Sequence, residues 1–152
     1  MRRENIAALI FVLAALGVPG IGWLTRSSLP IPRELGRTLG GLIFLLGMGA
    51  FTWIVAHIKE AFLGEVAPVT DRLIKNGPYR WVRHPLYLSM MIVLLGIAFA
   101  FRSLWGVVGV FVLFLPAVAY RAKLEDEALS WKFGSDWEDY ASDTAFLFPW
   151  LW

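Results

Sequence analysis

The sequence has no cysteine, only two histidines, and long stretches without a charged residue. The lack of cysteine excludes a disulfide framework, a thiolate zinc site and a cysteine nucleophile. His57 and His84 form no metal-binding spacing such as HExxH, so no metal site is predicted. A P-loop, a G-x-S-x-G elbow and a dinucleotide fingerprint are also missing. The net charge of +2 is too small to indicate nucleic-acid binding.

Charged residues are scarce, and they are scarcest in a few long stretches of the chain. Charged residues make up 17% of the chain and hydrophobic residues 58%, whereas soluble domains have about a quarter and about half. The excess lies in long apolar runs, which indicate a membrane protein rather than a large soluble core. The 152 residues suffice for one domain. We therefore predict a single integral membrane domain over residues 1–152.

The apolar runs predict an all-α, polytopic helix bundle with about four transmembrane helices, at residues 6–24, 38–57, 85–100 and 104–119. The first run is close to the ~20 residues that cross a bilayer and has no cleavage pattern, so it is interpreted as a span. The last two are shorter and predict a helical hairpin. Charged residues 120–133 predict a C-terminal amphipathic helix that leaves the fourth span, with Gly134 as its cap. Pro116 is expected to kink the last span.

Glycines are frequent near the start of the second predicted span. Small residues let transmembrane helices approach closely, so we expect these glycines to face another helix. They are Gly36, Gly40, Gly41, Gly47 and Gly49.

Lysine and arginine positions indicate an orientation. With the N-terminus in the cytoplasm, ten of the 14 basic residues fall on the cytoplasmic side, which the positive-inside rule favours. We therefore expect an inner (cytoplasmic) membrane protein with both termini in the cytoplasm. Ion conduction is not predicted, because residues 6–24, 38–56 and 104–119 carry no ionisable group.

Two polar segments, residues 77–87 and 121–129, flank the predicted hairpin. Because a hairpin brings its ends together, His84 and Arg121 are expected to be neighbours, and Arg121 shares a helix face with Glu125. Tyrosine rings such as Tyr79 and Tyr87 can attract a cation and stack on a base, which suits a ligand such as S-adenosylmethionine. The same residue types also serve as ordinary anchors and orienting charges at the membrane surface. Both interpretations stay open on these grounds.

Residues 77–87, GPYRWVRHPLY, resemble the G-x-Y-x-x-x-R-H-P-x-Y signature of the isoprenylcysteine carboxyl methyltransferase family and its phospholipid-methyltransferase-like relatives. Residues 121–140 resemble the second motif of that family, R-x-x-x-E-E-x-x-L-x-x-x-F-G-x-x-Y-x-x-Y. Asp126 replaces the second Glu, and Trp137 stands where the first Tyr is usual. The resemblance covers roughly the C-terminal half of the chain.

This resemblance implies a membrane methyltransferase that uses S-adenosyl-L-methionine, with a cytoplasmic cofactor region over residues 70–87 and 120–140. It implies that Arg121 contacts the acceptor, as the candidate catalytic residue. The cofactor-binding residues that it implies are Leu73, Ile74, Tyr79, His84, Pro85, Leu86, Tyr87, Glu125 and Asp126.

The implied reaction is methyl transfer to a membrane-accessible, lipid-like or small hydrophobic acceptor that carries a carboxylate, an amine or a thiol. The expected partners are the lipid bilayer and this acceptor, with no nucleic acid and no metal. Two alternatives are an NADPH-dependent membrane reductase of sterol-reductase-like architecture and a non-catalytic membrane protein that keeps the fold. The chain is short for such a reductase, and the Glu125-Asp126 pair favours the methyl donor.

Overall fold

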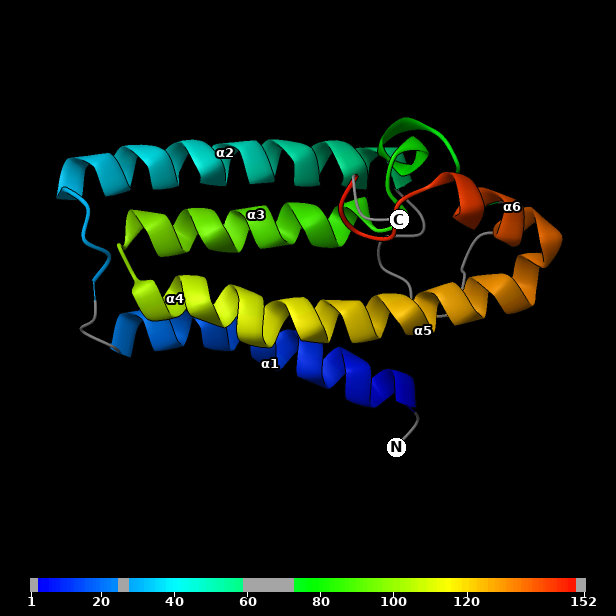
Figure 1. The fold of residues 1–152 in the computed structure, drawn as a ribbon, viewed down its shortest axis with the longest axis horizontal. Helices are drawn as coiled ribbons and strands as arrows, with labels where there is room; N and C mark the ends of the chain where they lie inside the picture. Colours follow the sequence, from blue (N-terminus) through cyan, green and yellow to red (C-terminus); the bar gives the residue numbers. More distant parts are fainter. Residues whose placement is uncertain (1–2, 25–27, 59–72, 150–152) are drawn as a thin grey trace.

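A computed structural model describes residues 3–24, 28–58 and 73–149 (Figure 1). These residues form helices joined by turns and two isolated β-bridges, which confirms the all-α prediction. In chain order the elements are α1 (Arg3–Leu24), α2 (Arg33–Ile58), the 3₁₀ helix η1 (Gly77–Arg80), α3 (Pro85–Ala100), α4 (Leu104–Gly109), the π-helical η2 (Val110–Phe114), α5 (Leu115–Phe133) and α6 (Ser135–Asp143).

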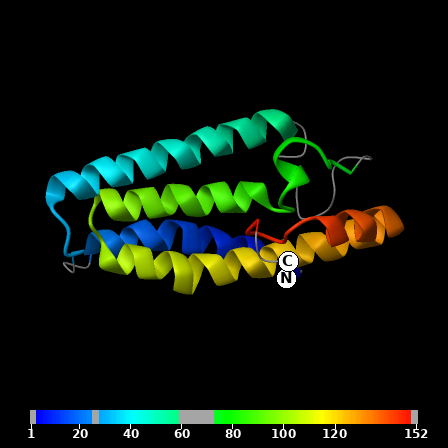
Figure 2. The ribbon, with the colours of Figure 1, turned by 45° about the horizontal axis from the view of Figure 1, so that its top comes forward.

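The long helices lie side by side along one axis (Figures 1 and 2). Helix α3 lies between α2 and the rod formed by α4, η2 and α5, and α1 packs against that rod. The C-terminal end of α2, the start of α3 and the second half of α5 lie toward the same end of the bundle, where α6 also lies. This arrangement brings the two polar segments of the sequence to the same end.

Two of the helices extend beyond the apolar runs that predicted the spans. Helix α1 begins at Arg3 rather than at residue 6, and α2 runs from Arg33 to Ile58 rather than over residues 38–57. Hydropathy detects only the apolar part of a helix, whereas the hydrogen-bonded backbone continues through polar residues. In α2 the carbonyl of Pro32 accepts the Gly36 N–H at 3.0 Å, and Glu34 complements the positive end of the helix dipole.

Within the described residues, two helices are long and apolar enough to cross a membrane, Arg33–Ile58 and the continuous rod Leu104–Phe133. The apolar stretches Ile6–Gly17 and Pro85–Ala100 are shorter, and the total of four spans stays a prediction. Large aliphatic side chains face outward: Leu16 is 70% exposed and Leu46 67% exposed. Such a surface matches lipid rather than water.

The close contact between α2 and α3 depends on glycines, which have no side chain. A Cβ atom on Gly40 would lie 2.2 Å from the backbone nitrogen of Ala100, and one on Gly47 would lie 2.7 Å from the backbone of α3. The expected close packing is therefore confirmed at these positions. Gly41 and Gly49 face open space, because a Cβ atom added at either position would meet no neighbouring atom within 4 Å.

The hairpin turn at the far end of the bundle is held by one arginine. Arg102 has a positive φ of 55°, and its Nη2 donates to the carbonyl of Leu29 at 3.1 Å. The hydroxyl of Ser103 then caps α4 by accepting the Gly106 N–H at 2.9 Å. The turn thus ties the hairpin to the segment that precedes α2.

A wide, π-helical turn precedes Pro116, where a kink is predicted from the sequence. The Leu115 N–H donates to the carbonyl of Val110, five residues earlier, which is the π-helical pattern of η2. Proline lacks an N–H and commonly disturbs the preceding turn. Helix α5 then continues as predicted to Phe133 and ends at Gly134, whose φ of 53° favours glycine. Helix α6, which follows, was not predicted.

Candidate functional site

Three side chains join the start of α3 to the middle of α5. The Tyr87 hydroxyl donates a hydrogen bond to Glu125 Oε1. Arg121 Nε donates to the same hydroxyl oxygen at 2.7 Å. Arg121 Nε and Glu125 Oε1 also form an i, i+4 ion pair at 3.4 Å. Tyr87, Arg121 and Glu125 therefore form a closed triangle of polar contacts between the two helices.

His84 lies between two carboxylates. Its Nε2 is 2.8 Å from Asp126 Oδ1, and its Nδ1 is 3.6 Å from Glu125 Oε2. Burial lowers the pKa of this histidine, but the hydrogen bond to Asp126 and the interactions with Glu125 outweigh burial and raise the pKa above its ordinary value. The geometry therefore favours a protonated imidazole that donates a hydrogen bond to Asp126 and forms an ion pair with Glu125.

The local sequence explains this placement. Pro85 occupies the first turn of α3, where its missing N–H leaves no hydrogen bond unmade. Tyr87 follows His84 by three residues, and their rings lie 5.9 Å apart in a stacked arrangement. The carboxylates of Glu125 and Asp126 come from adjacent positions on α5 and approach the imidazole at its two nitrogens.

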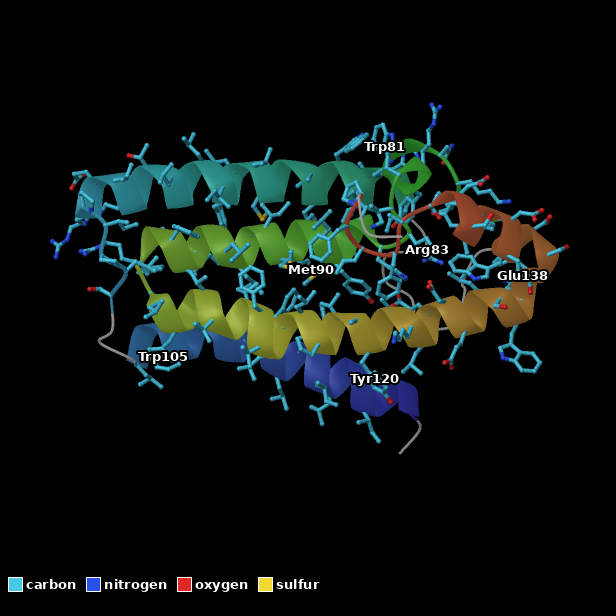
Figure 3. The ribbon with its side chains drawn as sticks, viewed as in Figure 1. Trp81, Arg83, Met90, Trp105, Tyr120 and Glu138 are labelled. Carbon is cyan, nitrogen blue, oxygen red and sulfur yellow. The ribbon has the colours of Figure 1, made fainter. Side chains whose placement is uncertain are left out.

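Arg83 adds a second arginine behind this cluster. Its Nη1 lies 3.8 Å from Asp126 Oδ2, and its guanidinium stacks over the Phe146 ring at 5.6 Å. Its Nε is buried without a hydrogen-bond partner among the described residues. Figure 3 shows Arg83 at the end of the bundle, between the chain that precedes α3 and α5. Arg83 therefore does more than orient the chain in the membrane, since it helps to hold Asp126.

Helix α6 and the chain after it hold the η1 segment over the cluster. The Tyr140 hydroxyl donates to the carbonyl of Tyr79 at 2.8 Å. Lys75 Nζ donates to the carbonyl of Asp136 at 2.9 Å. Burial raises the pKa of Tyr79, and it raises the pKa of Tyr140 to about 12. Both phenols therefore stay protonated at neutral pH, and Tyr140 stays a donor.

An open hollow of about 540 Å³ lies beside the cluster, within the ~300–1,000 Å³ usual for small-molecule sites. Asp126 lines it and also holds His84. The other lining residues are Glu127, Ser130, Trp131 and Trp137. Carboxylates, a hydroxyl and indole rings are the groups that a cationic ligand with hydroxyls and a flat base requires.

The structure brings together five of the predicted site residues: His84, Tyr87, Arg121, Glu125 and Asp126. His84 and Arg121 are linked through Tyr87 and Glu125 rather than directly.

The remaining predicted residues have other positions. Tyr79 contributes its carbonyl and a largely buried ring. Leu73 and Ile74 are half-buried ahead of η1, and Pro85 and Leu86 form the first turn of α3. Residues 70–72 of the predicted cofactor region lie outside the described residues.

Phe11 was missed by sequence reasoning. The Arg121 guanidinium carbon lies 5.6 Å from the centre of the Phe11 ring, and the Tyr87 ring lies 5.5 Å from it, edge-on. Helix α1 is apolar throughout its middle, so no local signal distinguishes one inward ring from the residues around it. Phe146, whose ring lies 5.2 Å from His84, was missed for a similar reason.

A family model described as phospholipid methyltransferase matches residues 35–136. This stretch contains α2 except for its first two residues, the η1 segment, the hairpin and all of α5, and hence every polar residue of the cluster. Searches of curated proteins and of solved structures found no match. The family match covers about two thirds of the chain, and the outward aliphatic surface is that of a membrane protein. The chain therefore belongs to the phospholipid methyltransferase family.

Proposed function

We propose that this protein transfers a methyl group from S-adenosyl-L-methionine to a membrane-accessible, lipid-like or small hydrophobic acceptor. The observation that carries the proposal is the meeting of His84 and Tyr87 with Arg121, Glu125 and Asp126 at one end of the bundle. This cluster combines half-buried carboxylates, aromatic rings and an arginine, beside a hollow of suitable size. The proposal agrees with the family of the chain.

The cofactor residues follow from the chemistry of this donor set. Glu125 and Asp126 suit an ammonium group or ribose hydroxyls, and the rings of Tyr79 and Tyr87 suit a sulfonium. Leu73, Ile74, Pro85 and Leu86 would contribute backbone groups and apolar surface. The donor supplies a methyl group that its positive sulfur has already activated.

Arg121 is the residue that we assign to the acceptor. Its guanidinium can hold a carboxylate, a phosphate or a carbonyl oxygen in a fixed direction. The polar triangle fixes its Nε, so the direction of the side chain is set before the acceptor arrives. Positioning of this kind can contribute an effective molarity of ~10⁵ M or more.

His84 has a positioning role in this proposal and does not act as a base. Its raised pKa favours the charged ring, which donates from Nε2 to Asp126 and faces Glu125 with Nδ1, so neither nitrogen is free to accept a proton. The reaction then depends on alignment and on the exclusion of water rather than on proton removal by this ring.

The acceptor would enter from the lipid and the cofactor from the cytoplasm. Outward leucines on α1 and α2 favour contact with acyl chains, and the polar cluster lies at one end of the apolar bundle. In this proposal four helices span the inner membrane and both termini face the cytoplasm. Such an arrangement suits a substrate with an apolar tail and a reactive head group, as in isoprenylcysteine carboxyl methyltransferase-like enzymes.

Two measurements test the function. Purified protein should bind S-adenosylhomocysteine and not NADPH in isothermal titration, which separates the methyltransferase from the reductase. Incubation with methyl-labelled S-adenosylmethionine and a total extract of lipids and small molecules should then yield a labelled product. Binding of NADPH alone, or binding of neither compound with no labelled product, would overturn the proposal.

Two substitutions test the residues. Arg121→Ala is expected to abolish transfer while binding of S-adenosylhomocysteine is largely kept, and Glu125→Ala is expected to weaken that binding. Arg37 and Glu34 supply a matched control, because they form an exposed Arg–Glu pair on α2. Arg37→Ala and Glu34→Ala should leave both measurements unchanged. If Arg121→Ala and Glu125→Ala kept normal turnover, the site assignment would be wrong.

A further inference from the structure

Helix α1 lies outside residues 35–136, which the family model matches, yet it contacts the polar cluster. Most of the residues around Phe11 face outward: Leu9, Ile10, Val12 and Leu13 are each at least 42% exposed. Phe11 itself is half-buried and points into the bundle, toward α3 and α5.

The spacing of small residues explains this inward ring. Ala7 and Ala14 are buried and lie four residues before and three residues after Phe11, so the three share one face of α1. Two alanines allow α1 to come close to its neighbours, and the single large ring between them fills the remaining space. The ring contacts Phe114, 5.6 Å away between centroids, and Tyr87, 5.5 Å away.

We propose that Phe11 is a positioning residue, which holds the Arg121 guanidinium against its ring face so that α1 forms one wall of the site. The consequence for catalysis rests on the proposed function, in which Arg121 holds the acceptor. The guanidinium carbon lies 5.6 Å from the ring centroid, within the ~6 Å of a cation–π contact.

The position of Arg121 depends on contacts from three helices. Tyr87 on α3 and Glu125 on α5 hold its Nε. Phe11 on α1 is the aromatic contact to its guanidinium. A leucine at position 11 would keep an apolar surface, but it has no negative ring face to attract the cation.

Phe11→Leu separates the charge effect from packing, and Phe11→Tyr keeps the ring. We expect Phe11→Leu to lower kcat/KM for labelled methyl transfer into total lipid extract by about three- to thirtyfold, the range of a cation–π contact. Binding of S-adenosylhomocysteine should stay within about twofold of the wild type, because Glu125 and Asp126 are untouched. Phe11→Tyr should keep most of the activity. Phe111→Leu is the matched control, since it makes the same change at a ring that is 49% exposed.

A second experiment needs no turnover and so distinguishes this inference from the proposed function. Phe11→Leu, Arg121→Gln and the double variant form a mutant cycle, read as thermal unfolding of the purified protein. If the contact between Phe11 and Arg121 is real, Arg121→Gln should destabilise the Phe11→Leu variant less than it destabilises the wild type. Additive shifts in the cycle, or a Phe11→Leu enzyme with wild-type kcat/KM, would overturn the proposal. An inactive wild-type protein with a non-additive cycle would refute only the methyltransferase proposal.

Discussion

The two ends of the helical hairpin both hold a partly buried arginine, but with different partners. At the far end, Arg102 donates to the carbonyl of Leu29 and fixes a turn. At the near end, Arg121 lies among a phenol, a carboxylate and an aromatic ring. At the far end the arginine contacts a backbone carbonyl, which is a structural interaction. At the near end the arginine contacts several side chains that can also bind a ligand. The difference indicates which end carries the chemistry.

The largest expected effect comes from the same substitution at the two ends. Arg121→Ala should reduce methyl transfer by more than ~100-fold, because it removes the group that orients the acceptor. Arg102→Ala should leave the rate of transfer within about twofold of the wild type, because Arg102 lies far from the site and its loss alters only stability. Initial rates of labelled methyl incorporation measure both. If the two variants lost activity equally, the contrast between the ends would be wrong.

A smaller effect, on stability rather than activity, is expected along the α2–α3 contact. Gly40→Ala places a methyl group 2.2 Å from the backbone of Ala100, and overpacking of this kind costs about 1–3 kcal/mol. Gly41→Ala is the matched control: its methyl group meets no atom within 4 Å, and better helix propensity makes it neutral or stabilising. Thermal midpoints in detergent distinguish them. Equal midpoints would mean that α2 and α3 pack less closely than described.

The next effect concerns the cover over the near end. Tyr140→Phe removes the hydrogen bond to the Tyr79 carbonyl, which should cost about 1 kcal/mol of stability. We expect weaker binding of S-adenosylhomocysteine as well, because Tyr79 belongs to the proposed cofactor residues. Tyr120→Phe is the control, since Tyr120 is 41% exposed on α5. Unfolding and titration measure the two effects, and identical values for both variants would argue against a covering role.

Sequence patterns predicted the parts of the structure that depend on local order. The apolar hairpin, the continuation of α5 past Tyr120 and the end at Gly134 follow from hydropathy and helix-cap chemistry. The hairpin also predicts that the segments around His84 and Arg121 meet. The contacts of Phe11, Phe146 and Arg102 could not be predicted in this way.

The reason is physical. These three contacts join segments far apart in the chain, and each depends on how whole helices rotate and slide against one another. An inward phenylalanine on an apolar helix has the same local sequence as one that faces lipid. The packing of α1 against α3, η2 and α5, by contrast, selects Phe11 for the cluster.

The smallest expected effect is a dependence of stability on pH at the near end. Burial lowers the pKa of His84, but the two carboxylates, Asp126 and Glu125, outweigh burial and leave this pKa above its ordinary value. Because this pKa is higher in the folded state than in the unfolded chain, the stabilisation is fully present below about pH 6.5. It is lost as the pH rises through the folded-state pKa.

Thermal midpoints between about pH 6 and about pH 9 provide the test. The difference between the wild type and His84→Gln should shrink as the pH rises, since the neutral imidazole no longer holds both acids. His57→Gln is the control, because His57 is exposed and contacts only the Asn76 side chain among the hydrogen bonds of the described residues. This control separates the loss of an imidazole as such from the loss of the His84 contacts. A constant difference for His84→Gln would mean that His84 is neutral, and that its ring then donates to only one of the two carboxylates.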